Sequence, residues 1–366
     1  MNKTISCYLD AWRFMLAMVV FLGHVAATRL TGGFLWQLGI YTTEAVSVFF
    51  VLSGFVIGYV TDQRENELFS YAIARAARIY SVALPALCLT FLLDAVGRVA
   101  RPDLYTESWG YIADGRVWQF VSGLVFINRL WGINVPQGSD LAYWSLGCEV
   151  WYYAIFGVLL FARGWWRVLG TVGGLVIAGP LTALLFPLWL LGVWGYRVCR
   201  TPLARVELGW CLFVGSVVLW IVYEASAPWH RRLDWFIPSR LDRPQLIQDY
   251  IVGVLFVVHL IGFRTVSNRF APFFASTAVP IRWVAGSTFS LYLFHLPIAQ
   301  FLASRFSWAP TSLAMRTLII GGTLAMVFIL AEFTERRKEP WRKSLASIIS
   351  YLRRRYQKLG AERQSA

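Results

Sequence analysis

Residues Trp12 to Ala27 read WRFMLAMVVFLGHVAA, an apolar stretch that is interrupted by two ionisable side chains, Arg13 and His24. Ionisable residues at membrane depth are costly, so they commonly serve a function. Eleven residues of α-helix advance the chain by about 16 Å and turn it by three turns plus about 20°. The pattern therefore predicts a membrane helix with both side chains on one stripe, which favours chemistry within the bilayer. A helix-packing contact is the alternative.

The composition is that of a membrane protein. Hydrophobic residues make up 57% of the chain and charged residues 15%, against about 25% charged residues in soluble domains. The mean hydropathy is +0.55, and the 18 tryptophans suit the two membrane interfaces. The five cysteines are scattered and have neither a disulfide framework nor metal-ligand spacing. We therefore expect no metal site and no permanently bound cofactor.

Apolar segments separated by short polar turns predict an all-α, polytopic membrane helix bundle of about ten transmembrane helices. We place these spans at 9–28, 43–61, 80–98, 143–162, 168–186, 187–199, 208–224, 249–265, 283–303 and 313–332. Pro187 is expected to mark a hairpin or a kink between the fifth and sixth spans. The segment 118–131 is too short to span, so we expect it to be re-entrant or interfacial.

The distribution of charge predicts the orientation of the bundle. The chain carries a formal net charge of +14, and ten basic but only three acidic residues follow position 334. Because Lys and Arg concentrate in cytoplasmic loops, we expect both termini to be cytoplasmic. Residues 1–335 would form the transmembrane domain and 336–366 a basic tail that contacts membrane lipids, not nucleic acid. The longest outward-facing stretches would be 99–142 and 225–248.

Two polar groups in the first half of the chain are candidates for function. Arg75 and Arg78 share a helix face at the expected cytoplasmic edge of the third span, where they would hold a phosphorylated ligand; positive-inside charge is the alternative. Ser53 belongs to a small Ser-Gly pair in the second span. Close helix packing is the favoured interpretation of that pair.

Two further groups follow in the second half. Glu149 lies four residues after Ser145 and five after Trp144, at the start of the fourth span, where a carboxylate is costly enough to favour function over packing. Tyr292 and His295 lie in the ninth span, five and two residues before Pro297, whose ring frees a nearby carbonyl.

Taken together, these motifs resemble the acyltransferase-3 family of integral membrane acyltransferases. The segment 9–14 with His24 is similar to the family's Arg-x10-His signature. The run 49–55, the Arg75–Arg78 pair, residues 144–149 and residues 290–297 resemble its later motifs, in the same order. The resemblance implies a multi-pass protein of the bacterial inner membrane. Such a protein moves an acyl group, most often acetyl, from cytoplasmic acetyl-CoA to a carbohydrate hydroxyl of a surface polysaccharide, O-antigen or lipid-linked oligosaccharide.

The residues themselves suggest roles in such a reaction. His24 is the natural general base, and an acetyl-histidine intermediate is a variant of that scheme. Glu149 would hold the acceptor or orient the imidazole, and Arg13 would stabilise the donor carbonyl or pair with Asp10. Arg75 and Arg78 would bind the CoA phosphates, and supporting roles fall to Asp10, Ser53, Trp144, Ser145, Tyr292 and His295. The rival hypotheses are a transporter or flippase of a lipid-linked sugar, and the same fold with succinyl or another acyl donor.

Overall fold

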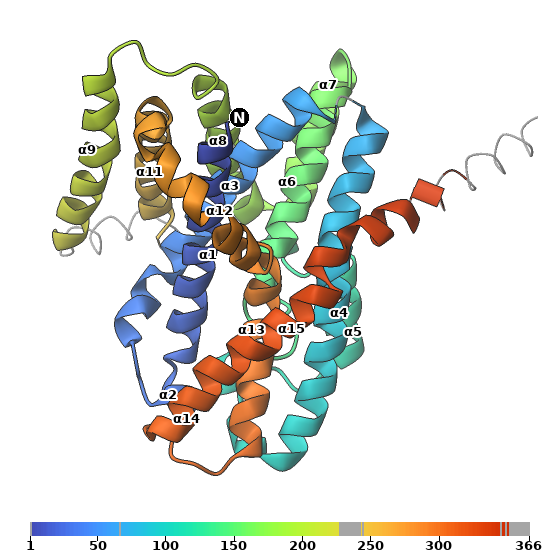
Figure 1. Ribbon diagram of the computed structural model, residues 1–366. Helices are drawn as coiled ribbons and strands as arrows, with labels where there is room; N and C mark the ends of the chain where they lie inside the picture. Colours follow the sequence, from blue (N-terminus) through green and yellow to red (C-terminus); the bar gives the residue numbers. More distant parts are fainter. Residues whose placement is uncertain are drawn as a thin grey trace, which may run out of the picture.

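The computed structural model describes residues 2–65, 67–226, 243, 245–344, 346, 347 and 350, and these residues form helices without strands (Figure 1). The predicted all-α bundle is thereby confirmed. Within the described part, eight helical segments are long and apolar enough to cross a membrane: Lys3–Val25, Trp36–Gln63, Leu68–Ala100, Tyr143–Phe161, Pro180–Val198, Val206–Ala225, Leu246–Ala285 and Leu313–Ser344.

Two of the ten expected spans fall outside this set. Helix α7 (Trp165–Ala178) has only 14 residues. Helix α13 (Thr288–Arg305) has 18 residues, but polar side chains such as His295 and Gln300 lower its hydropathy. Both of these side chains are nevertheless fully buried, because α13 runs through the middle of the bundle against α1 (Lys3–Val25) and α4 (Leu68–Ala100).

Two predicted boundaries differ from the structure. The turn between α7 and α8 (Pro180–Val198) is at Gly179, and Pro187 lies inside α8. Gly179 has a φ of 89°, which favours glycine, and a Cβ there would lie 2.5 Å from the backbone N of Trp131. Helix α4 begins at Leu68 and not near residue 80. Arg75 and Arg78 are therefore the eighth and eleventh residues of this helix.

The predicted close packing at the Ser53-Gly54 pair is confirmed. Helix α3 (Thr42–Gln63) packs tightly along α8, with a glycine of each helix at the contact. A Cβ on Gly54 would lie 1.9 Å from the carbonyl O of Trp189, and a Cβ on Gly192 would lie 1.9 Å from the carbonyl O of Val51. The two backbones can approach this closely only because both positions lack a side chain.

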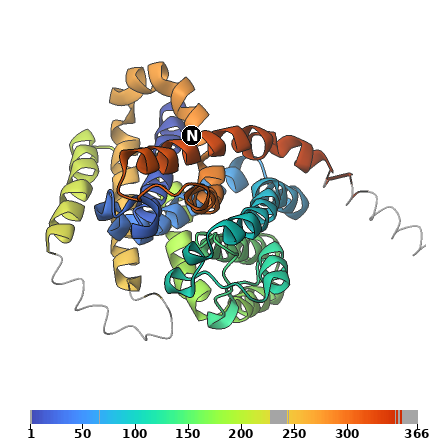
Figure 2. The ribbon, with the colours of Figure 1, turned by 90° about the horizontal axis from the view of Figure 1, so that it is seen from below.

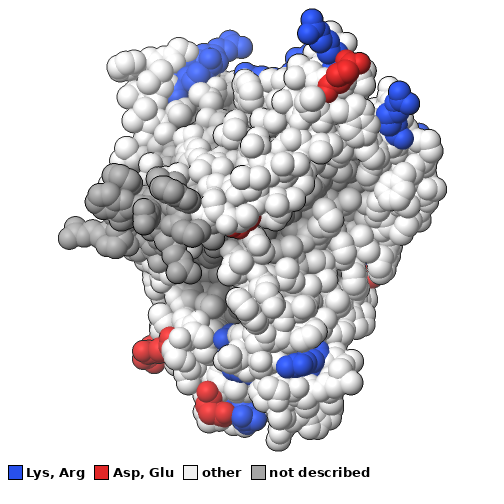
Figure 3. All heavy atoms as spheres, turned by 90° about the vertical axis from the view of Figure 1, so that its left-hand side faces the viewer, with Lys and Arg blue, Asp and Glu red and all other residues white. Residues whose placement is uncertain are grey.

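The remaining long helices surround this centre. Seen from below, α9 (Val206–Ala225) lies at the edge of the bundle beside α11 (Leu246–Val266) (Figure 2). Helix α12 (Ala271–Ala285) packs on α1, and α15 (Thr323–Phe333) packs on α13. On the face shown in Figure 3, the visible charged side chains gather toward the two ends, with mostly uncharged surface between them. This distribution suits a membrane-embedded bundle.

The segment between α4 and α6 (Tyr143–Phe161) folds back along α4. Its helix α5 (Arg116–Leu124) runs beside α4, and the hydroxyl of Tyr80 donates to the carbonyl O of Leu124 at 3.1 Å. Tyr80 is the thirteenth residue of the 33-residue α4, so the returning segment reaches far along that helix. We refer to residues 101–142, which return along α4, as the re-entrant segment.

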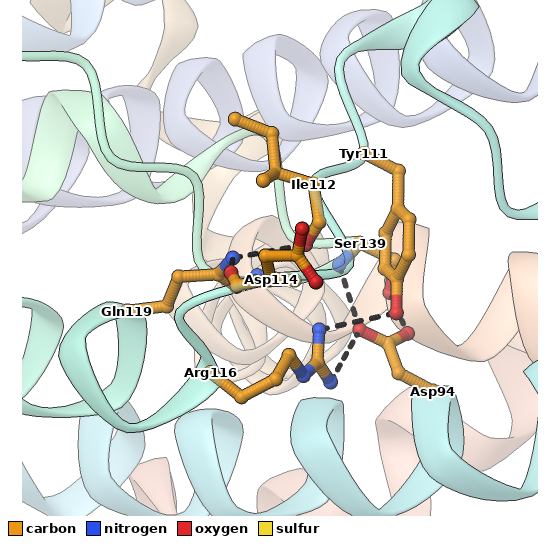
Figure 4. A network of polar contacts seen from close by, with 8 residues as sticks. Asp94, Tyr111, Ile112, Asp114, Arg116, Gln119 and Ser139 are labelled. Atoms are coloured by element: carbon orange, nitrogen blue, oxygen red, sulfur yellow. Dashed lines mark hydrogen bonds and ion pairs between the residues drawn. The ribbon is translucent and has the colours of Figure 1, made fainter.

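A polar network fastens this re-entrant segment to α4 (Figure 4). The buried carboxylate of Asp94 accepts hydrogen bonds from Ser139 Oγ at 2.5 Å and from the Ser139 backbone N–H at 2.9 Å. It also receives Arg116 Nη2 at 3.3 Å. Gln119 joins the two limbs of the segment, because its Oε1 accepts from the Gly138 N–H and its Nε2 donates to the carbonyl O of Ile112. Side chains of α4 and α5 thus hold the segment between α4 and α6 in place.

Candidate active site

A cavity of about 90 Å³ lies between α1, α3, α4, α6 and α13. Each of these helices contributes at least one polar side chain to its lining. Seven of the eleven predicted site residues line this cavity: Arg13, Ser53, Arg75, Arg78, Ser145, Glu149 and Tyr292. The fold therefore brings together side chains that lie up to 279 positions apart in the chain. We refer to this space as the central cavity.

Hydroxyl groups surround the carboxylate of Glu149. Its Oε1 accepts hydrogen bonds from Ser53 Oγ at 2.6 Å and from the hydroxyl of Tyr153. Ser53 Oγ also receives the indole N–H of Trp189 at 3.2 Å. Among the described residues, no hydrogen bond joins Glu149 to His24. Glu149 is therefore held on the α3–α6 side of the central cavity, away from the imidazole.

A second contact closes the cavity on the α13 side. The Ser145 and Tyr292 hydroxyl oxygens lie 2.6 Å apart, which connects the start of α6 to α13. Tyr292 is three residues before His295 and shares its helix face. The central cavity thus ends about one helical turn from His295.

The two arginines of α4 have different surroundings. Arg75 Nη2 donates to both carboxylate oxygens of Glu65, at 2.9 and 3.2 Å, and both side chains are nearly buried. Arg78 lines the central cavity and also a neighbouring one. Arg75 is therefore neutralised by an intramolecular ion pair with Glu65, and Arg78 is the one of the two arginines that reaches the neighbouring cavity.

The neighbouring space, which we refer to as the basic cavity, has a volume of about 330 Å³. Five cationic residues and two acidic ones line it: Arg13, Arg78, Arg282, Arg336, Lys338, Asp10 and Glu335. Arg13 Nη1 lies 3.7 Å from Asp10 Oδ1, as the i,i+3 spacing predicted. Arg13, Arg78 and Phe289 line both cavities, so the two spaces are neighbours across these side chains.

The wall of the basic cavity near α13 is built by the chain that follows α15. The carboxylate of Glu335 accepts from the backbone N–H groups of Phe289 and Ser290 at 3.0 and 2.9 Å. A carboxylate at a helix N-terminus satisfies donors that have no partner within the helix. Arg336 Nη2 donates to Ser287 Oγ at 2.9 Å. Arg336 and Lys338, which the prediction placed in the tail, therefore line the cavity.

His24 pairs with His295 at the far end of α1. Its Nδ1 lies 2.9 Å from Nε2 of His295, and the two rings stack with centroids 5.1 Å apart. His295 Nδ1 lies 2.8 Å from the carbonyl O of Leu291, which can only accept, so this nitrogen carries the proton. In a neutral His295 the Nε2 atom then accepts from His24 Nδ1–H. The Nε2 atom of a neutral His24 therefore keeps its lone pair.

Beyond the histidine pair lies a cation that the sequence patterns did not single out. Arg29 Nε donates to Gln300 Oε1 at 3.0 Å, and the guanidinium lies 3.9 Å from the centre of the Trp109 ring. Gln300 Nε2 in turn donates to the carbonyl O of Leu104 at 2.6 Å. Arg29 follows α1, and Gln300 lies in α13 five residues after His295. The only sequence signal was an arginine shortly after the first span.

A third and larger space, which we refer to as the outer cavity, has a volume of about 680 Å³. It lies at the end of the bundle where α6 begins, and the re-entrant segment forms much of its wall. Trp144 lines it and does not line the central cavity. The Arg129 and Arg243 guanidinium carbons lie 5.7 and 5.2 Å from the centre of the Trp144 ring. Most of the expected outer stretch 225–248 lies outside the described residues.

Comparison with known proteins finds a family profile that matches most of the chain. The profile of the acyltransferase-3 family, described as an acyltransferase domain, matches residues 8–332. The acyltransferase MdmB of Streptomyces mycarofaciens is 28% identical over 195 residues, which cover 49% of this chain and 47% of that protein. The alignment thus spans about half the length of this curated relative. No solved structure matches the chain significantly.

Proposed function

The chain belongs to the acyltransferase-3 family, and on that premise we propose that it is a membrane-embedded O-acyltransferase. In this proposal the donor is an acyl-CoA, most simply acetyl-CoA, and the acceptor is a hydroxyl of a cell-surface or lipid-linked carbohydrate. The observation that carries the proposal is the hydrogen-bond chain from His24 through His295 to the carbonyl O of Leu291. This chain supports a basic Nε2 atom on His24.

The basic cavity is the proposed site for the phosphates of CoA. Arg13, Arg78 and Lys338 are among the cations that line it, and arginine and lysine are the usual phosphate ligands. The neighbouring central cavity would receive the pantetheine arm and carry the acyl group toward His295. Because Glu65 neutralises Arg75, we assign Arg75 to positioning α4 and not to the donor.

The proposed reaction is a direct transfer. His24 Nε2 removes the proton of the acceptor hydroxyl, whose oxygen attacks the thioester carbonyl carbon. The C–S bond then breaks, and the imidazolium returns the proton to the CoA thiolate, which leaves an ester and a free thiol. Arg29 is a cation well placed to stabilise the oxyanion. Arg13 is eleven residues from His24, or about 16 Å along the helix, which supports a donor role for Arg13 and not contact with this carbonyl.

The deciding experiment is acyl transfer in proteoliposomes that contain the purified protein. Acetyl-CoA labelled in the acetyl group would be supplied together with crude surface glycan. We expect label in the glycan with the wild type and its loss with His24→Ala at matched folded levels. A protein that neither consumes nor binds acetyl-CoA would contradict the proposal. The transporter or flippase hypothesis would then be the next to test.

Two variants of the scheme are tested by the same preparation. Labelled acetyl that stays on the protein after removal of CoA would support an acetyl-histidine intermediate at His24. Transfer from succinyl-CoA at a higher kcat/KM than from acetyl-CoA would replace the donor but keep the reaction class. Competition between acetyl-CoA and succinyl-CoA in one assay shows which donor is preferred.

A further inference from the structure

The outer cavity differs in charge from the basic cavity at the other end of the bundle. Among the described residues that line it, two acidic side chains, Glu107 and Asp140, match two basic ones, Arg129 and Arg243. Arg243 is further neutralised by Asp249, whose carboxylate lies 2.7 Å from Arg243 Nε. In the basic cavity, by contrast, cations exceed acids by three. A polyanion is therefore favoured in the basic cavity and an uncharged molecule in the outer one.

Asp140 lines the outer cavity and has a carboxylate oxygen without a hydrogen-bond partner. The residue is 1% exposed, and its Oδ1 accepts from the backbone N–H of Ala142 at 3.2 Å. Its Oδ2 atom is the unpartnered one and is buried. Burying a carboxylate oxygen without a hydrogen-bond partner is costly. A hydroxyl group of a bound ligand would supply the missing donor.

The wall that holds Asp140 is rigid. Gln137 and Asp140 form an antiparallel bridge, and Ser139 between them is bound through its Oγ and N–H to Asp94 of α4 (Figure 4). Gly138 has a φ of 58°, and a Cβ there would lie 2.2 Å from Asp94 Oδ2. The carboxyl of Asp140 is thus presented from a loop that is fastened on both sides. Such a fixed group can select among ligands.

The outer cavity also adjoins the helix that carries the proposed base. Thr43 lines it, and the preceding Thr42 packs against Gly23, where a Cβ would lie 2.4 Å from Thr42 Cγ2. Gly23 is the residue before His24. The first turn of α3 thus connects the outer cavity to the end of α1 at which His24 lies.

We infer that the outer cavity binds the uncharged, hydroxyl-rich part of the acceptor, with Asp140 Oδ2 accepting a hydrogen bond from one of its hydroxyl groups. This inference rests on the proposed function and names the substrate class: neutral sugar units, not uronic or sialic acids. The volume of about 680 Å³ lies within the range of about 300–1,000 Å³ that is usual for small-molecule sites. Side-chain amides such as Asn134 and Gln245 add donors and acceptors to the wall.

The test measures occupancy without requiring acyl transfer. Ile112, which lines the outer cavity and is 41% exposed, is changed to Cys, and its rate of modification by a membrane-impermeant methanethiosulfonate is measured. The probes are glycans released from the surface of the cells that naturally make the protein, separated by anion exchange into neutral and acidic pools. Ser108→Cys, exposed on the same segment but not lining the cavity, is the matched control, and the unsubstituted chain gives the background of the native cysteines.

We expect the neutral pool to slow modification of Ile112→Cys at least severalfold and to leave Ser108→Cys unchanged. With Asp140→Asn added, the neutral-glycan concentration needed for half-maximal protection should rise about 10–100-fold. This factor is the equivalent of one hydrogen bond to a charged group. The carboxamide can still accept from Ala142 but offers a donor in place of Oδ2. Should this variant fail to fold, Asn134→Ala in the same wall, at an exposed position, is expected to weaken protection by a smaller factor.

The outcomes separate this inference from the proposed function. Protection by the acidic pool alone, by neither pool, or to the same extent with Asp140→Asn would overturn the inference even if acetyl transfer occurs. Protection by the neutral pool that depends on Asp140, without any acetyl transfer, would sustain the sugar site and remove the proposed reaction. In an active preparation, Asp140→Asn should raise the KM for neutral glycan and leave that for acetyl-CoA unchanged.

Discussion

His24 Nδ1 lies 2.9 Å from His295 Nε2, although the two residues are separated by 271 positions in the chain. The contact is directional, because the Nδ1 proton of His295 is committed to the carbonyl O of Leu291. The carbonyl O of Leu291 thus fixes the tautomer of His295. His295 in turn determines which nitrogen of a neutral His24 keeps its lone pair. His295 acts on the reaction through His24 and is a positioning residue.

Replacement of His295 tests this relationship. We expect His295→Phe to lower kcat about 100-fold or more, within the range usual for loss of an effective general base, with the KM for acetyl-CoA unchanged. His295→Gln should recover part of the activity, because its carbonyl oxygen can accept from His24 Nδ1–H. Initial rates over a range of pH would be measured for both. Equal activity of the Phe and Gln variants would argue that the second ring only fills space.

The two arginines of α4 should respond differently to removal. Arg78→Ala should raise the KM for acetyl-CoA about 10–100-fold, because a phosphate would lose a charge-assisted hydrogen bond. Arg75→Ala leaves the buried carboxylate of Glu65 without its partner, so we expect a lower thermal midpoint and a much smaller change in KM. Donor kinetics and unfolding in detergent measure the two effects. A reversed pattern would move the phosphate site from Arg78 to Arg75.

The close contact of α3 and α8 should be intolerant of a methyl group. Gly54→Ala would place a Cβ 1.9 Å from the carbonyl O of Trp189, so the helices must separate. Overpacking of this kind typically destabilises by about 1–3 kcal/mol. Gly173→Ala in α7, where a Cβ meets nothing within 4 Å, is the matched control. We expect only the first variant to lower the thermal midpoint and the yield of folded protein, and equal behaviour of the two would contradict this account.

The attachment of the re-entrant segment to α4 should contribute measurably to stability and protease resistance. Asp94→Ala removes the acceptor of Ser139 and Arg116 and leaves Arg116 without its ion-pair partner; because Arg116 is 25% exposed, we expect a smaller effect than the roughly 3–5 kcal/mol of fully buried pairs. The expected result is faster cleavage of the segment 101–142 by added protease and a lower thermal midpoint. Arg101→Ala, whose pair with Asp103 is largely exposed, should leave both unchanged.

Much of the site could be predicted because its side chains belong to short motifs on single helices. Arg13, Glu149 and Tyr292 each stand out as polar groups in apolar segments, and the structure places all three on one cavity. That Arg13 can pair with Asp10 also followed from their spacing of three residues on one helix. Which segment forms a helix, and which side chains share one face of it, depend on neighbouring residues. Both can therefore be predicted from a single sequence.

Other features depended on contacts between distant helices. The pairing of His24 with His295, and of Arg75 with Glu65, is determined by helix rotation and packing, which hydropathy does not encode. The hairpin at Gly179 was missed because Pro187 gave a stronger breaker signal than a glycine. Arg336 was assigned to a tail because its neighbours are basic, yet it lines a cavity.

The Glu335 carboxylate, which caps α13 from beyond the end of α15, has a consequence for biogenesis. The proposed donor site combines Arg13 of α1 with Arg336 and Lys338, which follow α15 and are synthesised more than 300 residues later. During synthesis the site is therefore incomplete until α15 has been inserted and has docked. An unfinished chain would lack the means to hold acyl-CoA, so a partly assembled bundle would not waste the thioester by hydrolysis.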